Sequence, residues 1–265
     1  MVMRVSNLFS LEGKVVLITG GAGYLGSAMT EGFLEFGATV YIASRNVQNN
    51  QQFISKLNES GFSKVFTVDM DVTNSSSVQN AVNLIIEYEG KIDVLVNNAY
   101  SGKTGELLTG DEQDWLDSFN GSIHATYRVT KAVLPIMLKY NQGSIINISS
   151  MYGIVSPNPE IYADSSQNNP PQYGAAKAGI GQFTRYIAGH FAQQGVRANC
   201  ISPGPFPNEK TQHNIKFINE LSKKNPMQRI GKPNELKGVA ILLASDSSSY
   251  INGQTISVDG GWTIW

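Results

Sequence analysis

Seven short runs rich in Val, Ile and other β-branched or aromatic residues alternate along the chain with longer segments of helical spacing. The runs are KVVLIT, TVYIA, KVFTVDM, IDVLVNNA, GSIINISS, VRANCISPG and QTISVDGG. Strands that alternate with helices pair in parallel through right-handed crossovers, and the helices then cover both faces of the sheet. We therefore expect an α/β fold with a doubly wound parallel sheet of about seven strands. Its chemistry should lie in the loops that follow the strands.

Composition limits the classes of partner. The chain has 265 residues, 41% of them hydrophobic, so it can bury one sizeable core, and we expect a single domain over 1–265. Its formal charge is −1 and its Lys and Arg are scattered, which argues against nucleic-acid binding. One cysteine, Cys200, and three widely spaced histidines predict neither disulfides nor a metal site. No apolar run has signal-peptide or membrane-span length, so we expect a cytoplasmic protein without a membrane partner.

The stretch TGGAGYLG, residues 19–26, joins the first run to a helix-like segment. Gly20, Gly23 and Gly26 lack a Cβ, so backbone N–H groups and the positive end of a helix can approach a pyrophosphate. Such spacing alone also suits an ordinary tight turn. Its place directly after the first strand favours nucleotide binding.

Further motifs follow in order: VDMDVTN, NNA, SSMYG, YGAAK, ISPGP and VDGGW. Together with the glycine loop they resemble the short-chain dehydrogenase/reductases, in the branch of simple one-domain enzymes, from about Leu11 to Trp262. The resemblance implies a Rossmann-type fold and an NAD(P)-dependent oxidoreductase. Such an enzyme transfers a hydride between nicotinamide and a carbonyl or secondary alcohol.

The same resemblance implies the cofactor contacts. Asp71 and Val72 would flank the adenine, 97–99 would line the ribose side, and Pro203 with Gly204 would lie against the nicotinamide. Asn97 and Asn98 also suit a structural turn. The full set of expected cofactor-binding residues is Gly20, Gly23, Tyr24, Leu25, Gly26, Ser44, Arg45, Asp71, Val72, Asn98, Ala99, Tyr173, Lys177, Pro203 and Gly204.

Two details of these motifs depart from the usual pattern. The simple enzymes usually carry glycines at the second, sixth and eighth positions of the stretch, whereas here Tyr24 is sixth and its hydroxyl is placed to contact the cofactor. After the second strand, Ser44 and Arg45 replace the acidic residue that accepts hydrogen bonds from the NAD ribose. Arg45 can pair with a 2′-phosphate, which favours NADP over NAD. Gly23 stands where a second basic residue is often found in NADP-preferring relatives.

Catalysis of this kind needs a group that exchanges a proton with the substrate oxygen. Tyr173 and Lys177 in YGAAK lie four residues apart, on one face of a helix, and a nearby ammonium lowers the pKa of a phenol. The resemblance assigns Tyr173 as acid/base and Lys177 as its partner, which also holds the nicotinamide ribose. Ser150, before Met151, would hold the substrate oxygen, with Ser149 as a structural neighbour.

Two neighbouring positions test this assignment. Tyr162 lies at the usual distance after the serine, but Ser166 stands where its lysine would be, so Tyr173 is the candidate. A fourth catalytic residue, usually an asparagine seven positions after a tryptophan, holds a water for proton relay. Counting from Trp115 reaches Ser122 instead, with Asn120 as an alternative if the helix is shifted.

The interval between Ser150 and Tyr173 is lengthened by a loop, PNPEIYADSSQNNPP, residues 157–171, whose four prolines argue against a regular element. We expect it near the active site, although a solvated insert is the alternative. The expected substrate contacts are Ser150, Tyr152, Tyr162 and Phe206, with Met151, Asn158, Gln167 and Asn208 on the same wall. Amides, hydroxyls and aromatic rings suit a sugar or sugar acid, as in enzymes of the 5-keto-gluconate reductase type.

Other functions stay open. A 3-oxoacyl-thioester reductase would need a basic surface for an acidic carrier protein and a longer apolar trough. A nucleotide-sugar epimerase or dehydratase would need a substrate domain after the last strand, for which this chain leaves no room. A dinucleotide-binding regulator would not need Ser150, Tyr173 and Lys177. Relatives are usually tetramers built through the helices near 111–140 and 173–194, so we expect a homo-oligomer, a tetramer or a dimer.

Overall fold

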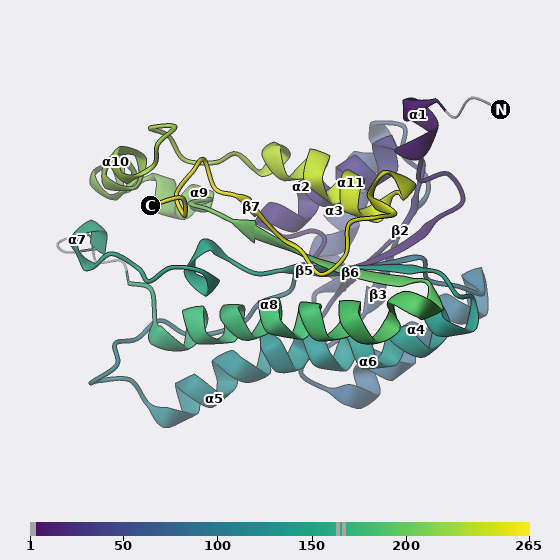
Figure 1. Cartoon of the computed structure of the whole chain (residues 1–265), viewed down its shortest axis with the longest axis horizontal. Helices are drawn as coiled ribbons and strands as arrows, with labels where there is room; N and C mark the ends of the chain where they lie inside the picture. Colours follow the sequence, from purple (N-terminus) through teal and green to yellow (C-terminus); the bar gives the residue numbers. More distant parts are fainter. Residues whose placement is uncertain (1–3, 163–164, 166–167) are drawn as a thin grey trace.

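The computed structural model describes residues 4–162, 165 and 168–265. A seven-stranded parallel sheet of order β3-β2-β1-β4-β5-β6-β7 runs through the molecule, as predicted (Figure 1). The strands are β1 (Val15–Thr19), β2 (Thr39–Ser44), β3 (Val65–Asp69), β4 (Val94–Asn97), β5 (Gly143–Ile148), β6 (Val196–Pro203) and β7 (Thr255–Val258). The α-helices are α1 (Val5–Leu8), α2 (Tyr24–Glu35), α3 (Val47–Glu59), α4 (Ser75–Glu89), α5 (Glu112–Asn120), α6 (Ile123–Lys139), α7 (Pro159–Tyr162), α8 (Pro171–Phe191), α9 (Glu209–Gln212), α10 (Ile215–Lys224) and α11 (Lys237–Ala244).

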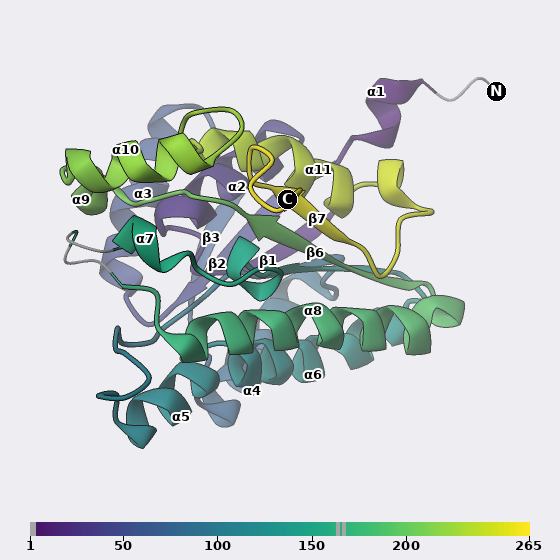
Figure 2. The ribbon, with the colours of Figure 1, turned by 60° about the vertical axis from the view of Figure 1, so that its left-hand side comes forward.

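Helices cover both faces of the sheet. Figures 1 and 2 show α2, α3 and α11 on one side and α4, α6 and α8 on the other. The residues of β1 alternate between the two layers: Val16 and Ile18 pack toward α2 and α11, while Val15 and Leu17 pack toward α4 and α6. Because an interior parallel strand is buried on both faces, most of its residues are apolar, as in β1. This explains why the seven runs could be recognised as strands from the sequence.

The carboxyl ends of the strands face a cap of short elements. At this end α7, α9 and α10 lie together (Figure 2), and a third apolar cluster joins Met151, Ile161, Phe217 and Trp262. Trp262 is buried in this cluster, whereas Trp265 is exposed. The switch point of the sheet lies between β1 and β4, where the chain direction around the sheet reverses.

Two expected elements differ from the structure. The loop 157–171 is not wholly irregular, because one helical turn, α7, forms within it and α8 begins at its last residue. The helical segment 111–140 is interrupted between α5 and α6, at Gly121 and Ser122. Within the described residues, no helix has the length and apolar character that crossing a bilayer requires.

Candidate active site

The glycine loop forms a tight turn from β1 into α2. Gly20 has φ +66°, in the left-handed region that favours glycine, and a Cβ on Gly26 would overlap the carbonyl oxygen of Gly20. No side chain caps the N-terminus of α2 at Gly23, so its first backbone N–H groups are available to an anion. Asn98 braces the turn, since its Nδ2 donates to the carbonyls of Thr19 at 3.0 Å and Gly20 at 3.1 Å.

A cavity of about 650 Å³ opens beside this turn. It brings together most of the expected cofactor-binding residues, namely Gly20, Gly23, Tyr24, Leu25, Gly26, Ser44, Arg45, Asp71, Val72, Asn98, Ala99 and Tyr173. Gly204 lies on the neighbouring cavity, Lys177 is buried beneath Tyr173, and Pro203 is buried at the end of β6. The open space, the glycine turn and the uncapped helix fit a dinucleotide.

Asn97 does not line the ribose side. Its Nδ2 donates to Thr130 Oγ1 at 3.0 Å and to Asn147 Oδ1 at 2.8 Å, in the interior between β4, β5 and α6. Successive residues of a strand point to opposite faces, so only its neighbour Asn98 reaches the cavity. Of the two roles considered for Asn97, the structure supports the structural one.

Tyr24 has a protein partner. Its hydroxyl accepts a hydrogen bond from Gln212 Nε2 at 3.0 Å, and Gln212 also donates to the carbonyl of Pro207 at 2.8 Å. Burial raises the pKa of Tyr24, so the phenol stays neutral. The ring that replaces the usual glycine thus connects the cofactor loop to α9, on the substrate side of the cavity.

The far end of the cavity carries the residues expected to choose between NAD and NADP. Ser44 Oγ donates to Asn50 Oδ1 at 3.1 Å, while Arg45 lies exposed at the rim. Hydrogen bonds from Thr73 lower the pKa of Asp71, and the charges of Arg45 and Arg128 lower it further. Two guanidinium groups therefore contribute positive potential at this end.

The candidate catalytic side chains meet where α8 crosses the ends of β5 and β6. Lys177 Nζ lies 5.7 Å from the ring centroid of Tyr173 and donates to the carbonyl of Ile148 at 2.8 Å. Ser150 follows β5 and shares a hydrogen bond with the Tyr173 side chain, which lowers the phenol pKa. Ser149 turns the other way and donates to the Lys177 carbonyl at 2.7 Å, as expected of a structural neighbour.

The pKa of Tyr173 departs from the expectation. Burial raises it, and nearby Tyr100 raises it further, against the lowering effect of Ser150. Burial also lowers the pKa of Lys177 to about 8. Lys177 directs its ammonium at the Ile148 carbonyl, so the expected lowering of the Tyr173 pKa by Lys177 is not found.

Ser122 lies at the break between α5 and α6. Its backbone has φ −126° and ψ −94°, and its Oγ is buried without a hydrogen-bond partner among the described residues. The preceding carbonyl, of Gly121, accepts from the Ser101 N–H at 3.2 Å. The Oδ1 of Asn120, the alternative to Ser122, accepts a hydrogen bond from Arg128 Nη2 at 2.7 Å.

A smaller cavity of about 230 Å³ adjoins Ser150 and Tyr173. It includes the expected Met151, Tyr152, Tyr162 and Phe206, and the two tyrosine hydroxyls hydrogen-bond to each other at 2.6 Å. Two other expected wall residues lie elsewhere, because Asn158 caps α7 and Asn208 faces the larger cavity. Gln167 and Ser166 fall outside the described residues.

Sequence reasoning missed several residues around the two cavities. Tyr100 packs edge-on against Tyr173, with 5.1 Å between the ring centroids. Lys177 Nζ lies 5.5 Å from the centroid of the Tyr100 ring. Asn168 and Asn169 line the smaller cavity. The NNA motif just before Tyr100 and the amide-rich end of the loop before Tyr173 were the available signals.

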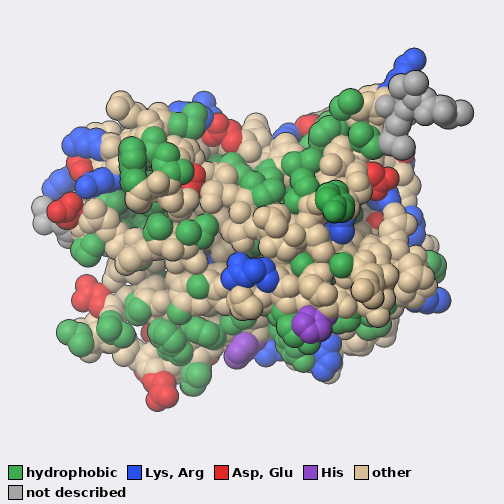
Figure 3. Space-filling model, in the orientation of Figure 1, with side chains coloured by type: hydrophobic (Ala, Val, Ile, Leu, Met, Phe, Trp, Pro, Cys, Tyr) green, Lys and Arg blue, Asp and Glu red, His purple; other side chains and the backbone are tan. Residues whose placement is uncertain are grey.

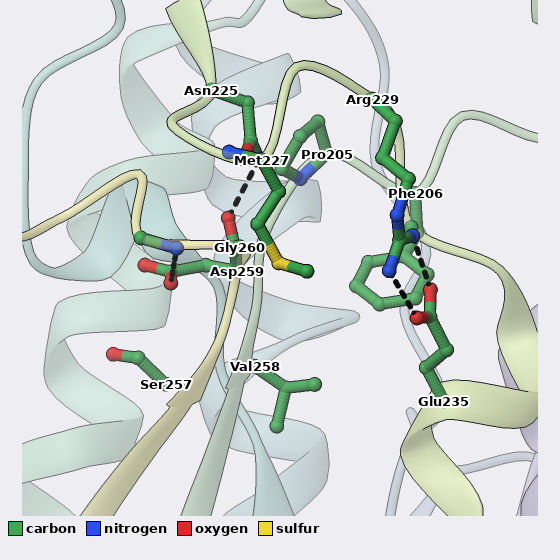
Figure 4. A pocket seen from close by; sticks show the side chains of 12 residues that line it. Pro205, Phe206, Asn225, Met227, Arg229, Glu235, Ser257, Val258, Asp259 and Gly260 are labelled. Carbon is green, nitrogen blue, oxygen red and sulfur yellow. Dashed lines mark hydrogen bonds and ion pairs between the residues drawn. The ribbon is translucent and has the colours of Figure 1, made fainter.

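Phe206 separates this cavity from a third one, of about 290 Å³, shown in Figure 4. There, Arg229 forms an ion pair with Glu235 at 2.6 Å, and Asn225 Nδ2 donates to the Asp259 carbonyl at 2.8 Å. The Asp259 carboxylate accepts from the backbone N–H groups of Gly261 and Thr263. These charged and amide groups are satisfied by the protein itself.

Comparison with known proteins agrees with this geometry. Residues 21–263 match the family model described as Enoyl-(Acyl carrier protein) reductase. The chain is 37% identical over 255 residues to 3-oxoacyl-[acyl-carrier-protein] reductase FabG of Thermotoga maritima, covering 96% of this chain and 99% of that protein. It is 31% identical over 265 residues to gluconate 5-dehydrogenase of Gluconobacter oxydans, covering 99% of both. The crystal structure of a gluconate 5-dehydrogenase from Burkholderia cenocepacia in complex with NADP and tartrate superposes with a TM-score of 0.89 at 29% identity, covering 99% of this chain and 100% of that one.

The chain belongs to the short-chain dehydrogenase/reductase family, as its motifs predicted. It is therefore an NAD(P)-dependent oxidoreductase. Relatives with different substrates match it over nearly their whole length, so the family does not fix the substrate.

Proposed function

We propose that the protein interconverts a carbonyl and a secondary alcohol on a small polyhydroxylated substrate, a sugar or sugar acid, with NADP as the favoured cofactor. One observation carries this proposal: the cavity beside Ser150 and Tyr173 measures about 230 Å³ and presents phenol hydroxyls and amides in addition to aromatic rings. Such a mixture suits a compact substrate with several hydroxyl groups.

In this mechanism Ser150 and Tyr173 both donate hydrogen bonds to the substrate carbonyl oxygen. The reduced nicotinamide, when bound, supplies a hydride to the carbonyl carbon. Because burial raises the pKa of Tyr173, its phenol is protonated at neutral pH and gives its proton to the oxygen as negative charge develops there. Lys177, whose ammonium lies 5.7 Å from the Tyr173 ring centroid, would hold the nicotinamide ribose.

Ser122 is proposed to assist the reprotonation of Tyr173 after each turnover. Its buried Oγ has no partner among the described residues and lies at a backbone break, where a water could be held. Ser122→Ala should then slow turnover, most strongly where reprotonation of Tyr173 limits the rate. An unchanged pH profile would argue against this role.

A 3-oxoacyl-thioester reductase is the second candidate, because relatives of that activity match the chain at up to 37% identity. Basic side chains on and near α10 also favour it, since they gather at the cap above the site (Figure 3, upper left). However, Lys223 pairs with Glu220 and Lys224 pairs with Glu160, which reduces the positive potential there. The small, partly polar cavity also suits a long acyl chain poorly.

Turnover assays separate these candidates. NADPH oxidation is followed with 5-keto-gluconate and other keto-sugars, and in parallel with an acetoacetyl thioester. We expect the keto-sugars to be the better substrates; rapid turnover of the thioester alone would overturn the proposal. Tyr173→Phe should abolish turnover while NADPH still binds. If turnover survives in that variant, the catalytic assignment of Tyr173 is wrong.

We also propose that copies of the chain associate through α6 and α8. These helices share an apolar groove that contains Tyr127 and Tyr186, which are 48% and 53% exposed, together with Leu134, Phe183 and Phe191. Tyr127→Glu with Tyr186→Glu should reduce the mass measured by light scattering from a tetramer or dimer toward one chain. Tyr88→Glu, at an exposed side chain on α4, is the matched control.

A further inference from the structure

Buried polar atoms without a hydrogen-bond partner are few among the described residues, and they call for an explanation. They are Asn97 Oδ1, Ser122 Oγ, Asn169 Oδ1, Arg197 Nη1, Ser202 Oγ and Ser247 Oγ. Of these residues, only Asn169 lines the cavity beside Ser150 and Tyr173. Asn169 is thus the residue that both borders this cavity and carries a buried amide oxygen without a partner among the described residues.

The cavity behind Phe206 provides a contrast. Its ion pair, its amide and its buried carboxylate are all satisfied within the protein, as the dashed lines in Figure 4 mark. These groups therefore need no ligand. The amide of Asn169 differs, because its oxygen is shielded from solvent and has no hydrogen-bond donor within the described part of the chain.

The backbone around Asn169 is fixed on both sides. Its neighbour Asn168 donates from Nδ2 to the carbonyl of Gly105 at 3.1 Å, which ties the loop to the segment after β4. Pro170 caps α8 and Pro171 is the first residue of that helix, so both have a restricted φ. The backbone of Asn169 is therefore held one helical turn before Tyr173.

We infer that Asn169 determines substrate specificity by accepting a hydrogen bond from a hydroxyl of the substrate next to the reacting carbonyl. This inference deepens the proposed function and rests on it. It also explains the inserted loop, because the lengthened interval before Tyr173 carries a recognition group to the substrate. Tyr152 and Tyr162, whose hydroxyls already form a hydrogen bond with each other, complete the polar wall of this cavity.

A site built to pair with a hydroxyl rejects analogues that lack it, because its own polar group is then left buried and unpaired. For one neutral hydrogen bond we expect a preference of about tenfold to a hundredfold in kcat/KM. Loss of the amide should remove that preference, mainly through a higher KM for the hydroxylated substrate.

The test compares 5-keto-gluconate with its 4-deoxy and 6-deoxy analogues, each of which lacks one hydroxyl beside the ketone. The ratio of kcat/KM values is measured for the wild-type protein, Asn169→Ala, Asn169→Asp and the control Asn80→Ala on the exposed face of α4. We expect wild type and Asn80→Ala to prefer the hydroxylated ketone over one analogue, Asn169→Ala to lose the preference, and Asn169→Asp, which keeps an acceptor oxygen, to retain part of it.

The outcomes distinguish this inference from the proposed function. If wild type prefers the hydroxylated ketone and Asn169→Ala keeps the same preference, Asn169 is not the recognition group although the function stands. If wild type reduces only the acetoacetyl thioester, both fail. NADPH affinity and melting temperature are measured in each variant, because a merely structural role would change these while leaving the substrate ratio unaltered.

Discussion

Tyr173 and Lys177 show how one environment acts in opposite directions on two side chains. Burial favours the neutral form of each, so it raises the pKa of the phenol and lowers that of the ammonium to about 8. At neutral pH both are still protonated. The pair is therefore prepared to give a proton to a carbonyl oxygen, which is what reduction requires, and oxidation should become faster as the pH rises.

Arg45 is the residue on which cofactor choice depends most directly. A charge-assisted pair with a 2′-phosphate contributes about 1.5–3 kcal/mol, so Arg45→Ala should weaken NADPH binding by about tenfold to a hundredfold. NADH binding should change less than about twofold by the same argument, because NADH lacks that phosphate. Fluorescence titration with both cofactors measures the effect, with Arg185→Ala on α8 as control. Equal weakening of NADPH and NADH binding would show that Arg45 does not contact the 2′-phosphate.

Tyr24 is a second residue whose contacts bear on cofactor binding. If its bond to Gln212 holds α9 against the cofactor loop, Tyr24→Phe should raise the NADPH dissociation constant by about threefold to tenfold, the worth of one neutral hydrogen bond. Gln212→Leu should produce the same effect, and the double variant should add little to it. Stopped-flow dissociation of NADPH provides the measurement. Fully additive effects would mean that the two side chains act separately.

Some of these residues could be found from the sequence and others could not. The resemblance of the motifs assigned Ser150, Tyr173 and Lys177, and local spacing agrees with it, because i,i+4 positions share a helix face and parallel strands end at one edge. The partner of Tyr24 lies 188 residues away, and no local pattern points to it. The inward direction of Asn97 depends on Thr130 and Asn147, which only the folded sheet brings together.

At the scale of elements, the strands were predictable because each is rich in β-branched and other apolar residues, whereas interruptions of helices depend on tertiary contacts. The break between α5 and α6 is an example. A Cβ on Gly121 would overlap Ser101, from the loop after β4, so the chain there is shaped by a segment twenty residues earlier. The turn α7 packs against α10, which lies more than fifty residues further along the chain.

The junction of β1 and α2 supports a prediction about a single methyl group. In Gly26→Ala the new Cβ would overlap the Gly20 carbonyl and approach Asn98 Nδ2 to 2.9 Å, so the turn must open. We expect NADPH binding to be lost and the free energy of unfolding to fall by about 1–3 kcal/mol, the usual cost of overpacking. Urea unfolding and NADPH titration measure the two effects.

Gly189 in α8 offers a matched control, because a Cβ there meets nothing within 4 Å. Gly189→Ala should leave NADPH binding unchanged and raise the free energy of unfolding by up to about 1 kcal/mol, from helix propensity. Retention of NADPH binding in Gly26→Ala would mean that the glycine loop tolerates a wider turn than its geometry indicates.

At the scale of the whole molecule, two buried groups on different elements act in opposite directions on stability at alkaline pH. Lys177 on α8 has a pKa of about 8, below its ordinary 10.5, and Cys200 on β6 has a pKa of about 11, above its ordinary 9.0. As pH rises above about 8, folded Lys177 loses its proton while the unfolded chain still holds one, so the cost of burying its charge disappears and the free energy of unfolding increases with pH. Above about pH 9 the thiol acts oppositely, since it ionises first in the unfolded chain.

The contribution of Lys177 can be isolated in a Cys200→Ala background. Between about pH 8 and about pH 9.5, the ionisation of Lys177 should raise the free energy of unfolding of the Cys200→Ala protein by about 1.5 kcal/mol. The double variant with Lys177→Met should show no such rise. Urea unfolding at each pH makes the comparison, and the difference between the two proteins removes the titration of the tyrosines that both contain. A parallel pH dependence in the two proteins would show that the ammonium of Lys177 is solvated and that burial does not set its pKa. Since the same burial keeps Lys177 beside Tyr173, that result would also change the electrostatic basis of the proposed proton transfer.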